Sequence, residues 1–407
     1  MHRFRFVPIS LPPWLASCLA VWLAATLAAC GPAQKQAPPP GQPKPVAKAA
    51  PRCTYAVRRL SAYGKGGARP QIAASSDAFI VAWEETADHR AVRVETFGAN
   101  AEPLGPTVDV GDVTSAVAEP RVAAFANPAD GFAVFWSTEQ ADTSTIAMRR
   151  VDRTGKPRTD VIPVVVAPGA RALDAVGSEA GMALAWWNWS GTPHQLAVSF
   201  FDKEGHSLGR PVTVTRAPAP DPTVDIVQGT TLRHRAVTVV AWDETVDQRE
   251  HVVVGDLGVA RLEGRVDLGL GETPRMGNGV LVWERAHEQA IYTAPLGGGE
   301  PKRLVEGHLP AAAPRGPRAT AICFLRDTDP TETEHIDELS CGDLVDGKVS
   351  DLTRVAVAAR GIFSLQLAVG PQGRIGVAWQ SQEEDDTAIS FAAVTCPDVA
   401  AAAIAPK

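Results

Sequence analysis

Acidic side chains that follow short apolar runs are the most obvious source of acid–base or cation-binding chemistry in this sequence. They are Glu84 and Glu85, Asp243 and Glu244, Glu284, and the segment from Glu383 to Asp386. A pair of such carboxylates could serve a glycosidase, but the sequence does not show which of them converge in space. None has the ligand spacing of an EF-hand calcium loop. We therefore expect most of them to be solvated tips of hairpins.

No catalytic motif accompanies these carboxylates. His287 and Glu288 lack the second histidine of a zinc-protease helix, and the chain has neither a Gly-x-Ser-x-Gly elbow nor a phosphate-binding loop. The sequence therefore predicts no catalytic residue, no metal ligand and no cofactor.

The densest aromatic cluster is Trp186-Trp187-Asn188-Trp189. Successive side chains of a strand point to opposite faces, so Trp187 or Trp189 could project and stack on a sugar or a peptide. Packing inside the core is the simpler interpretation, because large aromatic side chains are usually buried. The two tryptophans remain candidate ligand contacts.

The amino end has the layout of a secretory signal. Arg3 and Arg5 precede an apolar segment from Leu15 to Leu27 that is too short to span a membrane comfortably. It ends in Leu27-Ala28-Ala29-Cys30, which resembles the lipobox of bacterial lipoproteins. The resemblance implies that residues 1–29 are removed and that Cys30 carries the lipid. Gly31 replaces the aspartate that favours inner-membrane retention in that family, so we expect an outer-membrane anchor facing either the periplasm or the exterior.

Composition divides the rest of the chain. Residues 30–51 are rich in proline and cannot form a core, so we predict that they form a linker. Residues 52–397 form the predicted domain, and residues 398–407 a flexible tail. The formal net charge is −7 and becomes more negative once Arg3 and Arg5 are removed. This balance argues against nucleic acid as a partner, because phosphate binding needs a basic surface.

The predicted domain contains a repeat. Seven apolar runs end in an aromatic residue, and the endpoints are Trp83, Trp136, Trp186, Trp242, Trp283, Phe324 and Trp379. The units of roughly 50 residues match the period of four-stranded propeller blades. Short strands starting near Arg69-Pro70, Glu119-Pro120 or Thr273-Pro274 precede the runs, and glycine turns follow.

The second unit, from Pro120 to Pro157, resembles a tandem repeat of bacterial exported proteins that is thought to form propeller blades. The sixth unit departs from that pattern at Phe324. The runs are apolar at consecutive positions, as in strands covered on both faces, so we expect the aromatic residues to lie in the core. The predicted fold is all-β, a seven-bladed propeller, with six or eight blades left open by the uneven spacing.

Four cysteines remain once Cys18 and Cys30 are set aside, namely Cys53, Cys323, Cys341 and Cys396. In an oxidising compartment an even number suggests two disulfides, for which three pairings exist. The last unit supplies three strands only, and the segment from Cys53 to Leu60 fits the vacant place. This strand assignment predicts that Cys53 pairs with Cys396 at the ring closure, and Cys323 with Cys341 inside the sixth unit.

Three functions are compatible with these features. The first is a monomeric, lipid-anchored binding or scaffold propeller for a protein or a glycan of the envelope. The second is a propeller hydrolase or lyase that acts on glycans, and the third is a purely structural component. Carboxylates and an arginine converging in the central channel would favour the enzyme, whereas an apolar channel would favour binding.

Overall fold

The computed structural model describes residues 53–86, 90–112, 118–140, 143–188, 194–230, 237–258, 261–328, 336–384 and 386–396. These residues belong to one compact unit, Ala50–Lys407. None of the helices within them is long and apolar enough to cross a membrane. The signal segment, Cys30, the linker and the tail lie outside the described residues.

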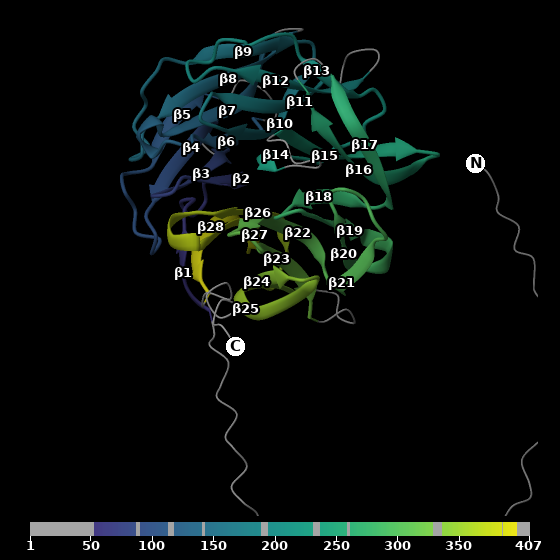
Figure 1. Cartoon of the computed structure of the whole chain (residues 1–407). Helices are drawn as coiled ribbons and strands as arrows, with labels where there is room; N and C mark the ends of the chain where they lie inside the picture. The colour runs from purple at the N-terminus through teal and green to yellow at the C-terminus, as the bar shows by residue number, and fades with distance from the viewer. Residues whose placement is uncertain are drawn as a thin grey trace, which may run out of the picture. The chain divides into compact units, whose positions relative to one another are not determined.

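Seven four-stranded antiparallel sheets surround a central axis, as Figure 1 shows, and we number these blades along the chain. Blade 1 consists of β2 (Gly67–Ala74), β3 (Phe79–Glu85), β4 (Ala91–Phe97) and β5 (Val108–Asp112). Blade 2 consists of β6 (Arg121–Ala124), β7 (Phe132–Gln140), β8 (Thr143–Val151) and β9 (Ile162–Ala167). Blade 3 consists of β10 (Ala170–Gly177), β11 (Met182–Asn188), β12 (Gln195–Phe201) and β13 (Val212–Thr215).

The second half of the ring repeats this order. Blade 4 consists of β14 (Val224–Thr230), β15 (Val237–Val246), β16 (Arg249–Leu257) and β17 (Leu262–Leu270). Blade 5 consists of β18 (Glu272–Met276), β19 (Val280–Arg285), β20 (Ala290–Pro295) and β21 (Lys302–Glu306). Blade 6 consists of β22 (His308–Arg315), β23 (Ala319–Asp327), β24 (Asp337–Val345) and β25 (Lys348–Ala358). Three short 3₁₀ helices, Pro128–Asp130, Ala286–Glu288 and Pro371–Gly373, lie in turns.

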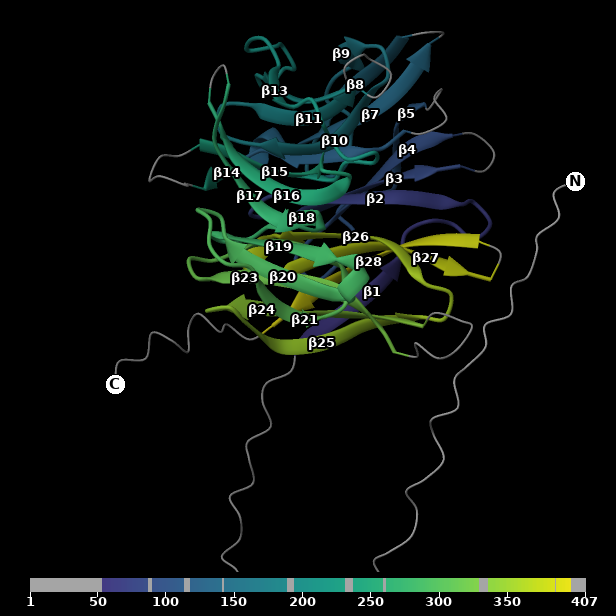
Figure 2. The same ribbon diagram turned by 90° about the vertical axis from the view of Figure 1, so that its right-hand side faces the viewer.

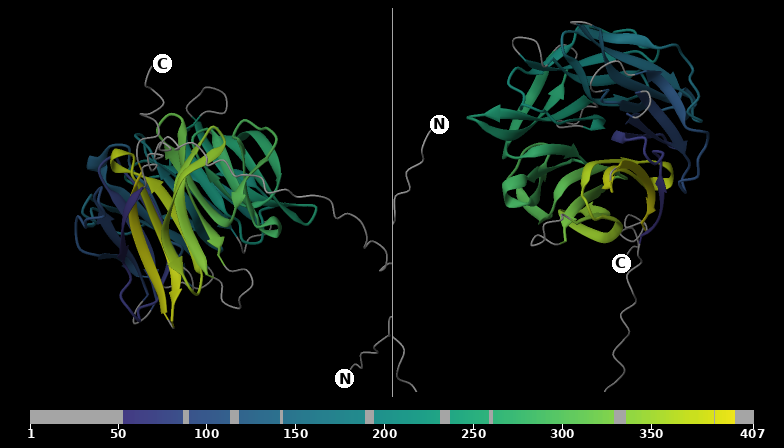
Figure 3. Two further views of the ribbon diagram at one scale, coloured as in Figure 1. Left: turned by 90° about the horizontal axis from the view of Figure 1, so that it is seen from below. Right: turned by 180° about the vertical axis from the view of Figure 1, so that it is seen from behind.

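Blade 7 closes the ring and joins the two ends of the chain. It contains β26 (Ile362–Val369), β27 (Ile375–Glu383) and β28 (Asp386–Thr395), and its fourth strand is the amino-terminal β1 (Thr54–Arg59). β1 pairs with β28 in antiparallel register, with Thr54 opposite Thr395. Figures 2 and 3 show purple β1 beside yellow β28. The predicted seven-bladed propeller with an amino-terminal closing strand is confirmed.

The aromatic ends of the apolar runs pack between neighbouring blades. All seven endpoints are at least 95% buried, and Trp83, Trp242 and Trp283 are completely so. Trp136 packs on the valines of blade 1, and a Cβ at Gly111 in that blade would lie only 2.2 Å from Trp136 Cζ2. Truncating such a tryptophan typically costs about 3–5 kcal/mol, so these contacts are a main source of cohesion between blades.

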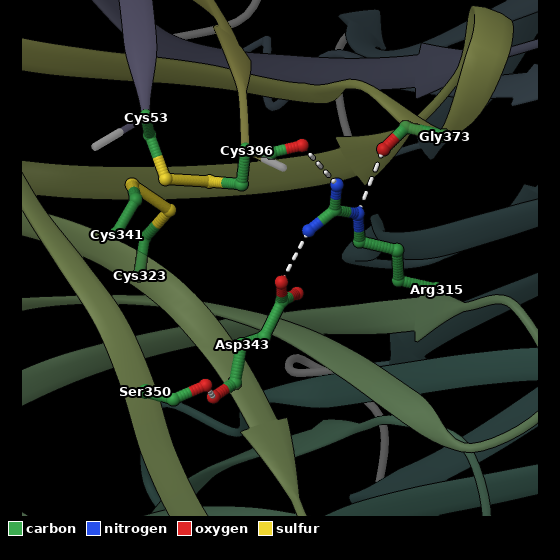
Figure 4. The surroundings of a disulfide bond; sticks show 8 residues. All are labelled: Cys53, Arg315, Cys323, Cys341, Asp343, Ser350, Gly373 and Cys396. Carbon is green, nitrogen blue, oxygen red and sulfur yellow. Dashed lines mark hydrogen bonds and ion pairs between the residues drawn. A yellow bond between two sulfur atoms is a disulfide. The ribbon is translucent and has the colours of Figure 1, made fainter. Parts of the chain in front are cut away.

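The cysteines form the two predicted pairs. Cys53 is bonded to Cys396 and Cys323 to Cys341, and all four share one core cluster between blades 6 and 7. Figure 4 shows Arg315 beside them. Its guanidinium forms an ion pair with Asp343 and donates to the carbonyl oxygens of Gly373 at 2.8 Å and Cys396 at 3.2 Å. Blade 6 is therefore tied to blade 7 by a buried charge.

Candidate binding site in the central channel

A bulge near the start of most inner strands aims one side chain of each blade at the axis. The pairing of the inner strand with the next strand shifts between Ala68 and Gln71, Ala172 and Asp174, and Glu272 and Arg275. Similar shifts occur in blades 6 and 7. Bulges of this kind bend a strand and redirect a side chain. Here they follow the Arg69-Pro70 and Thr273-Pro274 dipeptides that mark the strand starts in the sequence.

Seven residues occupy the same position in the seven blades, and we call them the channel ring. Each lies opposite the residue that precedes the blade's buried aromatic, as Arg121 lies opposite Phe135 before Trp136. The members, in blade order, are Gln71, Arg121, Asp174, Asp225, Arg275, Ala311 and Gln366. All seven line one central cavity of about 780 Å³.

The charged members are consecutive, and we call Arg121, Asp174, Asp225 and Arg275 the charged arc. Asp174 Oδ2 accepts a hydrogen bond from the Ile226 backbone N–H at 2.7 Å, and Asp225 Oδ2 accepts one from Met276 N–H in the next blade. One oxygen of each carboxyl group thus bridges two blades.

The two aspartates of the arc both have raised pKa values. Burial, and next the charge of Asp225, raise the pKa of Asp174 to about 7. Burial also raises the pKa of Asp225, against the opposing effects of Arg275 and of backbone hydrogen bonds. The negative charge of one carboxyl group therefore disfavours ionisation of the other.

The arginines of the arc flank this pair. Arg121 Nη1 donates to Pro120 O at 2.8 Å and its Nε to Leu173 O, while Arg275 Nη1 donates to Pro274 O at 2.9 Å. Arg275 Nε is buried and has no hydrogen-bond partner among the described residues. A buried donor without a partner costs free energy that a polar ligand could recover.

Glu119 provides a second unsatisfied group in the cavity wall. Burial raises its pKa, although Arg121, Arg171 and Arg69 oppose this effect. Its Oε2 atom is buried without a hydrogen-bond partner in the described part of the chain. The cavity therefore offers both a donor and an acceptor to a ligand that carries hydroxyl groups.

Phe363, near the start of β26, lines this cavity and is 56% exposed. It also lines a neighbouring groove of about 1180 Å³ between blades 5, 6 and 7. We call this the flanking groove. Among the described residues, no group of three His, Cys, Asp or Glu side chains is arranged to hold a metal ion.

The carboxylates that follow the tryptophans are mostly buried, so the prediction of solvated tips is wrong for Glu84, Glu85, Asp243, Glu244 and Glu284. Three of them accept hydrogen bonds from the backbone of the next blade: Glu84 from Ala118 at 3.2 Å, Asp243 from Thr273 at 3.4 Å, and Glu284 from Leu309 at 2.8 Å. These groups hold the inner strands together and are not part of the cavity. Glu383 and Glu384 are exposed as predicted, Asp386 is half-buried, and Asp385 lies outside the described residues.

Trp187 does not line the channel cavity. Trp187 is only 9% exposed and its ring lies 6.4 Å from the His194 ring, centroid to centroid. Trp189 lies outside the described residues. Their proposed ligand contact stays a prediction.

The sequence did not predict the charged arc, although Arg121 and Arg275 mark the starts of two predicted strands. Arg121 and Arg275 directly follow the prolines of the repeat and served only as marks of strand starts. Asp174 and Asp225 lack the proline, so no local motif links them. Aligning the units on the residue opposite the pre-aromatic position would have found all four.

Comparisons with known proteins add the fold only. No protein-family model and no curated protein matches the sequence. The chain resembles solved structures of prolyl endopeptidases, with 14% identity, a TM-score of 0.47, and coverage of 78% of this chain and 46% of that one. The β-propeller domain of the Trilobed protease from Pyrococcus furiosus gives 9% identity, a TM-score of 0.48, and coverage of 80% and 95%.

A neuraminidase-like protein of A/little yellow-shouldered bat/Guatemala gives 10% identity, a TM-score of 0.44, and coverage of 85% of this chain and 99% of that one. This chain spans about half the length of the prolyl endopeptidase that it matches. At such low identity these likenesses agree with a propeller but assign no activity.

Proposed function

We propose that this protein is a lipid-anchored binding propeller that holds the end of a glycan in its central channel. The observation that carries this proposal is the charged arc. Paired carboxyl groups and two guanidinium groups stand side by side on four consecutive blades, around a cavity of about 780 Å³. Sites that recognise small polar ligands are built from a few converging polar groups in such a cavity.

A sugar suits this site better than a compact ion does. Carboxyl oxygens accept hydrogen bonds from sugar hydroxyl groups, while guanidinium N–H groups donate to them. Arg275 and Glu119 line the cavity and supply N–H and carboxyl groups of this kind.

Hydrolysis or lysis of the glycan is the second candidate function. Carboxylates and arginines do converge in the channel, and a carboxyl group whose pKa is raised to about 7, as for Asp174, can act as a general acid or base. Against this, each aspartate is tied by one oxygen to the backbone of the next blade.

The anchor belongs to the same proposal. Cys30 would carry lipid in the outer membrane, and the segment 30–51 would separate the membrane from Cys53 at the ring closure. We expect a Cys30→Ala variant to leave the membrane fraction, because two or three acyl chains are needed for stable attachment. Cys18→Ala, which changes only the signal segment, is the control and should stay bound. A Cys30→Ala variant that remained on membranes would refute the anchor.

Calorimetric titration with oligosaccharides tests the binding function. We would use oligomers of N-acetylglucosamine, of glucosamine and of galacturonate, each from one to six units. Arg275→Met should weaken binding at least about tenfold, which corresponds to roughly 1.4 kcal/mol, and Arg261→Met, at an exposed side chain, should not change it. The proposal fails if no series binds, or if Arg275→Met binds as the wild type does. Release of new reducing ends that stops in Asp225→Asn would establish the enzyme instead.

A further inference from the structure

Phe363 joins two cavities that belong to different blades. It lines the central cavity together with the channel ring, and it lines the flanking groove together with His308, Arg326 and Arg360. Single exposed apolar residues are common on protein surfaces. Phe363 differs from the other exposed apolar side chains because it forms the boundary between two hollows.

The backbone beneath Phe363 is held in place by blade 6. The Ile362 N–H donates to Asp337 Oδ2 at 2.8 Å, and Asp337 Oδ1 lies 3.2 Å from His308 Nε2. Asp337 is buried, with 5% of its surface exposed. The aromatic ring is therefore presented from an anchored strand rather than from a loose loop, and a ligand that stacks on it would not have to order the backbone.

The size of the two hollows indicates a chain rather than a single small molecule. The central cavity measures about 780 Å³ and the flanking groove about 1180 Å³. A typical small-molecule site measures about 300–1,000 Å³. One sugar unit would use only part of the joined space, so several linked units are needed to fill it.

The charged side chains of the flanking groove determine which oligosaccharide charge it favours. Its carboxylates are Glu284, Glu288, Glu306, Asp327 and Asp337, and its arginines are Arg303, Arg326 and Arg360. His308 adds a positive charge when protonated. Burial alone would lower its pKa, but the hydrogen bond to Asp337 and the charges of Asp337 and Glu284 raise it. With His308 protonated, the groove has four cationic groups against five carboxyl groups, one of which, Glu284, has a raised pKa. The groove therefore has no excess of positive charge that would favour an acidic chain.

We propose that the ligand is an unbranched oligosaccharide of neutral or amino sugars, whose end lies in the channel and whose following units cross Phe363 into the flanking groove. This inference rests on the proposed function, because it assumes that the channel holds a sugar. It adds the direction of the chain, its minimum length and its charge. A peptide is the competing occupant, and the test below distinguishes it.

The dependence of affinity on chain length tests this inference. Wild-type protein should bind oligomers of four or more units of N-acetylglucosamine or glucosamine at least about tenfold more tightly than the single sugar. Phe363→Ala should lose about tenfold for the long oligomers and leave the single sugar unchanged. Phe363→Tyr keeps the ring and should restore the long-chain affinity. Leu208→Ala, which truncates another exposed apolar side chain, is the control.

Each outcome separates this inference from the proposed function. Equal affinity for one unit and six units would overturn the inference and leave sugar binding in the channel intact. Tighter binding of galacturonate oligomers would overturn the charge assignment. A lysine-rich peptide that displaced the long oligomer, with no oligosaccharide able to displace the peptide, would replace the glycan by a peptide. Failure of every sugar to bind would refute the proposed function itself.

Discussion

Blades 6 and 7 differ from blades 2 to 5 in how neighbouring blades are held together and in what they present to the channel. Blades 6 and 7 contain both disulfides and the buried Arg315–Asp343 pair, and their ring positions are Ala311 and Gln366. Blades 2 to 5 have no disulfide in the described residues, and they carry the charged arc.

The difference follows from where the chain begins and ends. Blade 7 is assembled from the two ends of the domain, so its pairing closes a loop of 343 residues and needs a covalent bond. Blades 2 to 5 are each built from one continuous segment and close short loops only. Because their stability does not depend on such a disulfide, they tolerate unsatisfied polar groups in the channel wall.

The largest effect should come from removing the latch. Cys53→Ser with Cys396→Ser should lower the free energy of unfolding by about 4 kcal/mol or more, because the unfolded chain loses a very long loop. Cys323→Ser with Cys341→Ser opens a loop of only 18 residues, and should cost about 3 kcal/mol. Urea unfolding of both pairs under oxidising conditions measures this. Equal losses, or a larger loss for the second pair, would contradict the closure argument.

The buried charge beside the latch should have the next largest effect. Arg315→Met leaves Asp343 without its cation and the carbonyl oxygens of Gly373 and Cys396 without a donor. Losing one partner of a buried pair costs about 3 kcal/mol or more. Arg374→Met, whose guanidinium bonds to Asn100 and Ala99 at the surface, is a matched control with a loss below about 1 kcal/mol. Thermal unfolding that ranked the two variants in the opposite order would show that the pair does not join the blades.

The charged arc should make stability depend on pH. The pKa of Asp174 is about 7 in the folded chain and about 3.9 when unfolded. The folded chain therefore binds more protons between these values, and stability falls as pH rises from about 4 to 7. Asp174→Asn keeps an oxygen for the Ile226 N–H and removes the titration, so this fall should become smaller. Asp160→Asn, at an exposed carboxylate, should leave it unchanged. Urea unfolding at a series of pH values tests this, and an unaltered slope in Asp174→Asn would contradict the raised pKa of Asp174.

The smallest expected effect concerns the bonds between blades outside the channel. Glu284→Ala removes the acceptor of the Leu309 N–H and should cost about 1–2 kcal/mol. Glu284→Gln retains an oxygen acceptor and should cost less, because burial already raises the pKa of Glu284 and favours its uncharged form. Denaturant unfolding that found the two variants equal would assign the effect to packing alone.

Much of the fold could be predicted because it is encoded at short range. The apolar runs ending at Trp83, Trp136 and the other aromatic residues mark the second strand of each blade, and their recurrence predicts the blades. The missing strand of the last unit predicts the place of β1 and, with it, the Cys53–Cys396 bond. Each of these features depends on neighbours along the chain or on a simple count of strands.

The functional surface could not be predicted in the same way. Glu84 and Glu284 resemble exposed turn residues in the sequence, yet they are buried because the next blade brings a backbone N–H group to each of them. Asp174 and Asp225 are 51 positions apart in sequence, and only the circular arrangement of the blades brings their carboxyl groups into contact.

The sequence by itself thus determined the repeat and the partners of the four cysteines, since alternation, turn residues and strand counts act locally. Tertiary structure alone decided that the blades number seven and which polar side chains face the axis. That choice depends on strand register and on contacts between blades, and no pattern within a single blade contains it. Contacts between blades likewise place Phe363 between the channel and the flanking groove.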